Sequence, residues 1–297
     1  MGRDVFGPDP APQRKVAAMT TAFVLSGGGN LGSVQVGMLQ ALWERGIKPD
    51  LIVGASVGSL NGAWLATRGP DTDLAALVGL WKRLRRNDVF PARPLRGLSG
   101  FLGRNDHLVP STGLRAIIRN DVGRGRLEDT SIPLHVVATD LLTGADVLLS
   151  RGDLADAVCA SAAIPGVYPI VEIDGRFLVD GGVVNNCPIS HAVELGASTV
   201  WVLPCGYACA LPSAPKGALA SALQAINVLV RHRLVVDIER YRHQTDLHVL
   251  PTLCPVNVGP TDFTQAERLI SDSYQLAREW FDDPGVGQGP GLHDHRS

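Results

Sequence analysis

The segment Gly54-Ala55-Ser56-Val57-Gly58 has the pattern Gly-x-Ser-x-Gly. It follows the apolar run 51–53 and precedes a helical pattern, so it predicts a strand that turns sharply into a helix. The flanking glycines permit so tight a turn, and the turn leaves the serine hydroxyl exposed above the sheet. Amides at the start of the helix, including that of Val57, face any anion that forms beside the hydroxyl. The segment predicts that Ser56 is a nucleophile.

A second motif, Ser26-Gly27-Gly28-Gly29-Asn30-Leu31-Gly32, lies between an expected strand at 22–26 and an expected helix at 32–45. Consecutive glycines let backbone amides turn toward a ligand, which suits an oxyanion hole. The same glycines match the Gly-x-Gly-x-x-Gly fingerprint of dinucleotide sites, which needs an acid at the end of the next strand. Here Asp50 precedes that strand. Oxyanion stabilisation is therefore favoured over nucleotide binding.

A serine nucleophile needs a base within hydrogen-bond reach. Asp180-Gly181-Gly182 follows the apolar run 177–179, so Asp180 is expected at the end of a strand, on a turn softened by glycines. Taken alone, the Asp-Gly pair indicates an Asx turn. His135 and His191 fall within an expected strand and an expected helix, away from strand ends. A Ser-Asp dyad is therefore favoured over a triad that contains histidine.

These motifs together resemble the patatin-like phospholipase family, from residue 21 to about residue 205. The resemblance also includes Ala160-Ser161-Ala162-Ala163-Ile164-Pro165-Gly166 and the stretch from Val183 to Asn186. It implies a lipid acyl hydrolase in which Ser56 attacks and Asp180 is the base. It also implies that Gly27, Gly28 and Gly29 form the oxyanion hole with Val57, and that lipid or fatty-acyl esters are the substrates. No cofactor and no metal are expected.

The chain departs from the resemblance at Leu31, where family members usually have Arg or Lys. Loss of one aligned donor costs about 100- to 1000-fold in rate, so a weaker oxyanion hole is expected. Asn30 is a candidate substitute donor. The departure leaves open a catalytically weak lipid- or nucleotide-binding protein of the same fold. An acyltransferase, in which an alcohol replaces the water, also stays open.

Alternating strand and helix patterns predict an α/β fold, a three-layer α/β/α arrangement with a mostly parallel central sheet, as the resemblance also implies. One hydrolase domain is expected over 19–283, between disordered segments at 1–18 and 284–297. A basic loop is expected over 82–104. Further strands are expected at 134–139, 146–150, 168–173, 177–179 and 199–203, and further helices at 154–162, 218–242 and 264–281. The apolar positions of 218–242 predict a helix packed in the core, rather than a lid or a membrane anchor.

The formal charge of −2 and the pI near 6.4 give no positive field for nucleic acid, so no nucleic-acid partner is expected. Five cysteines without a Cys-x-x-Cys pair predict reduced structural thiols. No run of about 18 apolar residues indicates a membrane span. We therefore expect a cytoplasmic protein, with peripheral membrane contact as a minority alternative. The sequence does not predict the oligomeric state, the acyl-chain length or the headgroup preference.

Overall fold

The computed structural model describes residues 19–91, 107–206, 218–254, 256, 258–259 and 261–283. The two segments expected to be disordered, 1–18 and 284–297, lie outside these residues, as does the basic stretch 92–104. The strands are β1 (Thr21–Leu25), β2 (Leu51–Ala55), β3 (Leu134–Asp140), β4 (Asp146–Leu149), β5 (Val171–Ile173), β6 (Arg176–Asp180), β7 (Thr199–Leu203) and β8 (Asp246–Val249).

Helices connect these strands. They are α1 (Gly32–Glu44), α2 (Val57–Arg68), α3 (Ala75–Arg83), α4 (Arg86–Val89), α6 (Thr112–Ile117), α7 (Leu154–Ser161), α8 (Gly182–Asn185), α9 (Ile189–Glu194), α10 (Ala218–Tyr241) and α11 (Ala266–Asp282). Short 3-10 turns lie at η1 (Gly29–Leu31) and η3 (Leu127–Asp129), and η2 (Ile118–Val122) is a π-helical turn.

The described strands form a single sheet in the order β5-β6-β3-β2-β1-β7-β8, and β4 pairs with β3 outside this path. The neighbouring strands in the part β3-β2-β1-β7-β8 are parallel. In contrast, β4 and β6 run antiparallel to β3, and β5 runs antiparallel to β6. Every residue of β2 is buried, as expected for a parallel strand that is covered on both faces. The mostly parallel sheet predicted from the sequence is confirmed.

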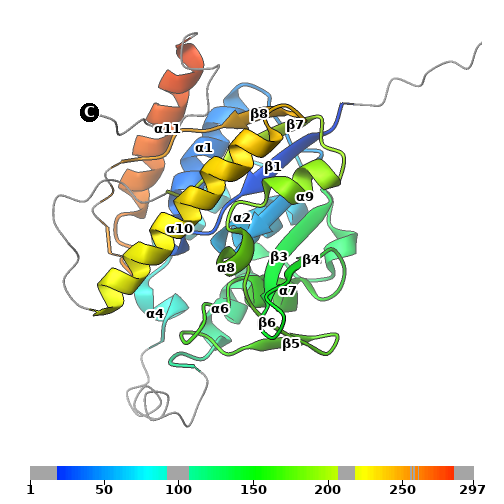
Figure 1. Ribbon diagram of the computed structural model, residues 1–297. Coiled ribbons are helices and arrows are strands. Elements are labelled where there is room, and N and C mark those ends of the chain that lie inside the picture. Colours follow the sequence, from blue (N-terminus) through cyan, green and yellow to red (C-terminus); the bar gives the residue numbers. More distant parts are fainter. Residues whose placement is uncertain are drawn as a thin grey trace, which may run out of the picture.

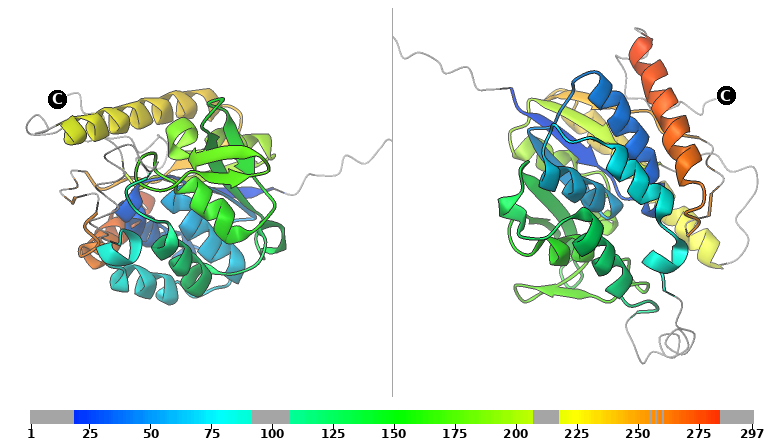
Figure 2. Two further views of the ribbon diagram at one scale, coloured as in Figure 1. Left: turned by 90° about the horizontal axis from the view of Figure 1, so that it is seen from below. Right: turned by 180° about the vertical axis from the view of Figure 1, so that it is seen from behind.

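Helices cover both faces of the sheet (Figures 1 and 2). Phe23 and Ile52 belong to one core together with residues of α1, α2, α3 and α11. Val24 and Val53 belong to a second core, which includes Leu234 of α10 and residues of α9. Alternate residues of one strand therefore serve different cores, and this alternation produces the predicted three layers.

Strand register places the site. Ala55 of β2 is level with Val137 of β3, so Ser56, the next residue, is level with Ala138. Ala138 pairs with Asp180, the last residue of the antiparallel strand β6. Ser56 and Asp180 therefore approach the same point of the sheet from opposite chain directions.

The expected basic loop is helical where it is described. α3 continues to Arg83, and α4 follows at once. Trp81 and Leu84 are buried, and the Asp88 carboxylate accepts a hydrogen bond from the amide of Arg85, which caps α4. The expectation of a loop from residue 82 is therefore wrong for this part, because burial of apolar side chains outweighs the local charge. β8 and α6 were not predicted, since both are short and β8 is half exposed.

Two further expectations need correction. Leu234, Ile238 and Tyr241 in the second half of α10 are buried, but Ile226 and Leu229 in the first half are exposed. Only half of this helix is therefore packed in the core. Cys159, Cys187 and Cys205 are buried free thiols, whereas Cys254 is disulfide-bonded, so the expectation of reduced thiols is wrong for Cys254.

Candidate active site

Ser56 occupies a strained turn between β2 and α2. Its backbone angles are φ 52° and ψ −125°, a region that L-residues rarely adopt. Such a conformation costs about 1–3 kcal/mol and persists only where its surroundings fix it. A side chain at Gly54 would meet the carbonyl oxygen of Gly58 at 2.7 Å, and one at Gly58 would meet that of Leu25 at 2.1 Å. Both glycines are therefore required by close backbone contacts.

The hydroxyl of Ser56 donates a hydrogen bond to Asp180 Oδ2 at 2.7 Å. The amide of Gly182 donates to the other carboxylate oxygen, Oδ1, at 2.7 Å. Thr139 Oγ1 donates to the carbonyl of Asp180 at 2.8 Å, which fixes the main chain of the base. Ser56 is 7% exposed and Asp180 is 6% exposed, so the pair is nearly shielded from solvent. The structure thus places the predicted nucleophile and base in direct contact.

Burial raises the pKa of Asp180 to about 6, although the hydrogen bonds from Ser56 and from the amide of Gly182 act in the opposite direction. Desolvation disfavours the charged carboxylate, and both donors favour it. A carboxyl group that titrates at about 6 is ionised at neutral pH and is a stronger base than a free aspartate. Asp180 can therefore accept the proton of Ser56.

The glycines after Asp180 let the turn pass close to the sheet. A side chain at Gly181 would lie 2.2 Å from the carbonyl oxygen of Val137. One at Gly182 would lie 2.6 Å from Asn186 Oδ1 and 3.0 Å from the Asp180 carboxylate. Only residues without a side chain fit these positions, because larger ones would displace the base.

The three glycines of the first motif have different roles. The amide of Gly27 donates to the carbonyl of Asn186 at 3.0 Å, so it is not available to an oxyanion. Within the described part of the chain, the amides of Gly28, Gly29 and Val57 donate to no protein acceptor. These three amides are free to bind an oxyanion, whereas the amide of Gly27, which was expected to take part, is occupied. That residue ties the loop to the turn after Asp180.

Asn30 and Leu31 do not replace the missing cation. Asn30 Nδ2 donates to the carbonyls of Gly259 and Asp262 at 2.9 and 2.7 Å, so the expected substitute donor holds another loop. Leu31 packs against the main core, close to Gly206. The donors identified at this site are therefore backbone amides.

A buried polar network behind the glycine loop was not predicted. Gln35 Nε2 donates to the carbonyls of Ser26 and Leu203 at 2.9 Å each, which joins the ends of β1 and β7. Asn61 donates to Gln35 Oε1 and accepts from Trp81 Nε1, both at 2.9 Å. No sequence pattern reveals these partners, because they come from α1, α2 and α3. The network fixes the base of the glycine loop.

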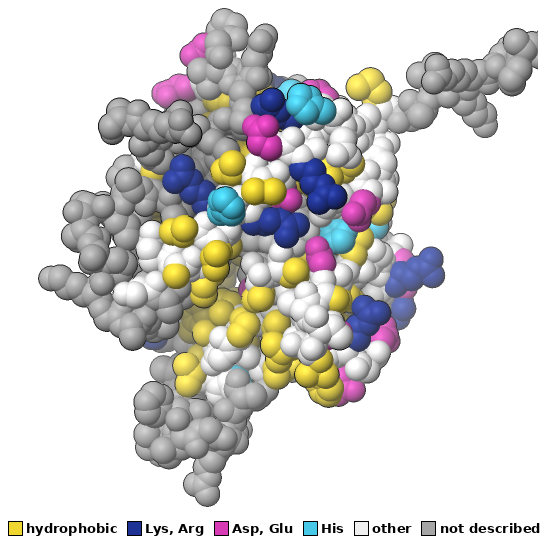
Figure 3. Space-filling view, in the orientation of Figure 1, with side chains coloured by type: hydrophobic (Ala, Val, Ile, Leu, Met, Phe, Trp, Pro, Cys, Tyr) yellow, Lys and Arg dark blue, Asp and Glu magenta, His cyan; other side chains and the backbone are white. Residues whose placement is uncertain are grey.

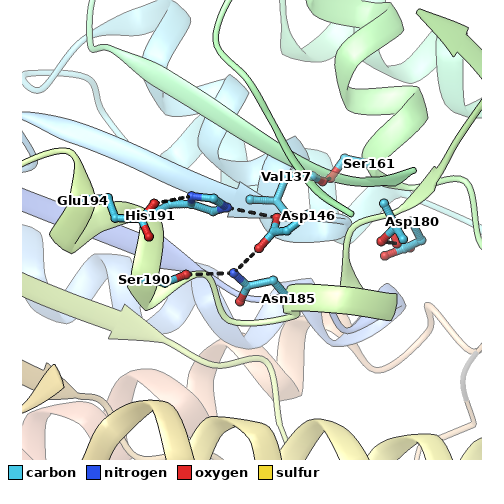
Figure 4. Close-up of polar contacts among 9 residues, drawn as sticks. Val137, Asp146, Ser161, Asp180, Asn185, Ser190, His191 and Glu194 are labelled. Carbon is cyan, nitrogen blue, oxygen red and sulfur yellow. Dashed lines mark hydrogen bonds and ion pairs between the residues drawn. The ribbon is translucent and has the colours of Figure 1, made fainter. Parts of the chain in front are cut away.

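The histidines lie outside the dyad. His191 Nε2 is 3.0 Å from Asp146 Oδ1, and Asn185 donates to Asp146 Oδ2 at 2.8 Å. Figure 4 shows this cluster beside Asp180 but directed away from it. His135 Nδ1 contacts the hydroxyl of Ser150 at 2.7 Å. The inference that neither His135 nor His191 contacts Ser56 is confirmed.

The described residues contain no group of three or more His, Cys, Asp or Glu side chains that could hold a metal ion. Asp50 Oδ2 accepts the amide of Thr21 at 2.7 Å, at the beginning of the sheet strands. It is therefore at the opposite end of the strands from the glycine loop, and a ribose hydroxyl held at that loop would not reach it.

The sequence of the chain matches the family described as "Patatin-like phospholipase" over residues 23–193, more than half of its length. The chain belongs to the patatin-like phospholipase family. The match contains the glycine loop, the nucleophile turn and Asp180, the same motifs that form the site. Membership in the family therefore agrees with the geometry.

Several relatives are similar to part of this chain. An uncharacterized NTE family protein of Mycobacterium tuberculosis is 35% identical over 192 residues, which are 63% of this chain and 51% of that protein. Patatin-like phospholipase domain-containing protein 7 of Rattus norvegicus is 30% identical and is aligned over 62% of this chain and 13% of its own. Lysophospholipase NTE1 of Candida glabrata is 30% identical, and the alignment covers 65% of this chain and 11% of that protein. The chain therefore spans about half the length of the mycobacterial relative and far less of the others.

Among solved structures, VipD from Legionella pneumophila is similar with a TM-score of 0.49 and 16% identity, over 90% of this chain and 67% of that one. The type III effector ExoU has a TM-score of 0.34 and 17% identity, over 88% of this chain and 53% of that one. Both scores are too low to support an argument about the site.

Proposed function

We propose that the chain is a serine lipid acyl hydrolase of the phospholipase A, lysophospholipase or carboxylesterase type. The hydrogen bond of 2.7 Å from Ser56 Oγ to Asp180 Oδ2, beside three free backbone amides, carries this proposal. Two of these amides belong to the glycine loop and the third to the start of α2. A hydroxyl, a base and oxyanion donors are the groups that acyl transfer requires.

In the proposed reaction, Asp180 Oδ2 accepts the proton of Ser56 while Oγ attacks the ester carbonyl carbon. The carbonyl oxygen becomes an anion and receives hydrogen bonds from the amides of Gly28, Gly29 and Val57. The tetrahedral intermediate collapses, and the leaving alcohol takes the proton from Asp180, so an acyl group remains on Ser56. Water then attacks the acyl carbon, and Asp180 accepts its proton. The acid leaves as the proton returns to Oγ.

A lipid substrate is supported by the names of the relatives, which include a lysophospholipase and a neuropathy target esterase of Drosophila melanogaster. Exposed apolar side chains after the base turn and on α10 support it independently. Val183, which follows the base turn, is 60% exposed, and Leu229 of α10 is 68% exposed. In Figure 3 hydrophobic side chains gather on this face. Acyl chains would find apolar contacts there.

Labelling by a fluorophosphonate, combined with hydrolysis of p-nitrophenyl esters, tests the proposal. Ser56→Ala and Asp180→Asn should each lower kcat at least ~1000-fold, because the nucleophile and its base act as a unit. Asp237→Asn is the matched control, since Asp237 is also buried and its pKa is also raised by burial. If the wild-type chain is not labelled and does not hydrolyse esters, the hydrolase proposal is wrong and the lipid- or nucleotide-binding alternative remains. An ester product in the presence of alcohol would indicate acyl transfer instead.

Contact with a membrane surface is a further part of the proposal. Ile226, Val228 and Leu229 in the first half of α10 are more than half exposed, and Arg231 and Arg233 follow them. Exposed apolar side chains next to cationic ones can contact a lipid interface. None of the helices within the described ranges is both long and apolar enough to cross a bilayer. We propose peripheral binding through α10.

A further inference from the structure

Ser161, the last residue of α7, is fully buried and lies beside both residues of the dyad. Its hydroxyl accepts a hydrogen bond from the amide of Ser56 at 2.8 Å. The same hydroxyl donates to the carbonyl of Val137 in β3 at 2.5 Å. Figure 4 shows Ser161 beside Val137 and next to Asp180. One side chain thus connects the nucleophile turn to the centre of the sheet.

The main chain at the end of α7 also holds the base. The carbonyl of Ser161 accepts the amide of Gly181 at 3.1 Å, and the carbonyl of Ala163 accepts the amide of Asp180 at 2.9 Å. Ser56 and Asp180 are 124 residues apart in the sequence. The segment 161–163 therefore contacts both partners of the dyad and sets their separation.

The amide of Ser56 requires this partner more than most amides do. Ser56 follows the last residue of β2, and its amide donates to the Ser161 side chain rather than to a carbonyl of a neighbouring strand. On the other side of Ser56, its carbonyl accepts the amide and the hydroxyl of Ser59 at 2.9 and 2.6 Å. Ser161 on one side and Ser59 on the other fix both peptide groups of the nucleophile.

We propose that Ser161 is a positioning residue that holds Ser56 Oγ in line with Asp180 during acyl transfer. Ser161 is not itself a nucleophile, because its hydrogen is donated to Val137 and its side chain is buried. It acts through the backbone of Ser56, and its loss removes the hydrogen-bond partner of the buried Ser56 amide. The proposal rests on the proposed hydrolase function.

The experiment compares Ser161→Ala with Ser273→Ala. Ser273 of α11 is equally buried, and its hydroxyl also donates to a backbone carbonyl, that of Ile270 at 3.1 Å, but it has no contact with the dyad. We expect Ser161→Ala to lower kcat about 10- to 100-fold with KM nearly unchanged, since small misplacement of a reacting group has this effect. Ser273→Ala should retain the wild-type kcat per folded molecule. Ser161→Thr, which restores a hydroxyl, should recover part of kcat if it folds.

Amide hydrogen exchange gives a second readout that does not depend on activity. In Ser161→Ala, peptides that contain Ser56 should lose protection, whereas in Ser273→Ala they should not. The proposal is overturned if Ser161→Ala retains kcat, if only KM rises, or if protection at Ser56 is unchanged. A wild-type chain without hydrolase activity would refute the proposed function, and hydrogen exchange would then decide alone whether Ser161 fixes the turn.

Discussion

Two donors reach the carboxylate of Asp180, the hydroxyl of Ser56 and the amide of Gly182. They stabilise its charge, but burial opposes them and prevails, so the pKa is raised to about 6. A histidine would supply a base with a similar pKa at an exposed site. The chain obtains this basicity from an aspartate by removing water from it. In the proposed reaction, the shielding of the dyad from water is therefore part of the chemistry.

This pKa predicts how activity depends on pH. Asp180 must be ionised to accept a proton, so kcat/KM should fall about tenfold per pH unit below about pH 6. Initial rates with a p-nitrophenyl ester between pH 4.5 and 8 would measure the acid limb. Circular dichroism over the same range would show whether the chain stays folded. A rate that is constant down to pH 4.5 would contradict the assignment of Asp180 as the base.

The same residue predicts a gain in stability when catalysis is removed. The pKa of Asp180 is raised from 3.8, so its favourable contribution to the free energy of unfolding is complete below about pH 4 and is lost as the pH rises through about 6. Asp180→Asn should therefore raise the free energy of unfolding at pH 8 by on the order of 2 kcal/mol and change it little at pH 4. Urea denaturation at both pH values measures this. A gain of equal size at both would refute the explanation.

Ser56 and Asp180 could be predicted because glycines mark both turns in the sequence. The contacts of Ser161 and Gln35 could not, since each connects segments brought together only by the sheet. Ser161 lies 105 residues from its partner Ser56, and Gln35 lies 168 residues from Leu203. Gly27 was misassigned for the same reason, because its partner Asn186 comes from a distant turn.

At the scale of elements, α2 begins immediately after β2 and crosses close to the end of β1. The backbone of Gly58 faces the carbonyls of Leu25 and Ser26 at a distance that excludes a methyl group. This contact joins the nucleophile turn to the glycine loop. The proposed oxyanion donors of the two segments are therefore held relative to each other by backbone packing.

Two glycine substitutions in helices should have opposite effects. Gly58→Ala should destabilise the chain by about 1–3 kcal/mol and abolish most activity, because the new methyl group would lie 2.1 Å from the Leu25 carbonyl. Gly79→Ala in α3 should stabilise it by about 0.5–1 kcal/mol, since the nearest atom there is 3.9 Å away, at the end of a flexible arginine. Thermal unfolding and ester hydrolysis of both variants measure the contrast. Equal effects would show that helix propensity, not contact, decides.

Elements with long periodic patterns were predicted well. The expected helix 218–242 is observed at Ala218–Tyr241, and the expected strand 199–203 matches Thr199–Leu203. β8 was missed, because it is short and lies at the sheet edge, where its side chains are only partly buried. The pattern of α10 correctly indicated a helix, but it did not indicate that the first half of the helix is exposed. Periodicity does not tell which apolar face finds a partner.

At the scale of the molecule, the two layers of helices are unequal. α1 and α11 pack against each other on one face of the sheet, whereas the first half of α10 extends over the other face with exposed apolar residues (Figure 2). Cys254 forms a disulfide, which favours an oxidising compartment. The expected cytoplasmic location stays a prediction.

Binding to lipid vesicles tests the role proposed for α10. Leu229→Glu should weaken binding to vesicles of phosphatidylcholine and phosphatidylglycerol about tenfold, because it removes a large apolar side chain from the interface. Hydrolysis of a soluble ester should not change. Gln275→Glu on α11 adds the same charge to the opposite layer and is the control. If both variants bind vesicles as the wild type does, α10 is not the contact.

The free amides of Gly28, Gly29 and Val57 have a consequence for how variation in this chain should be read. Every residue except proline has an amide, so Val57→Ala leaves that donor in place, whereas alanine at Gly28 adds a methyl group that would lie 2.3 Å from Cys205 Cβ. An alanine scan would therefore miss the Val57 donor, and at Gly28 it would report a steric clash rather than the loss of a hydrogen bond. Replacing a single amide with an ester linkage by chemical synthesis would remove one donor and leave every side chain unchanged. This replacement would measure how much each amide contributes to the rate of ester hydrolysis.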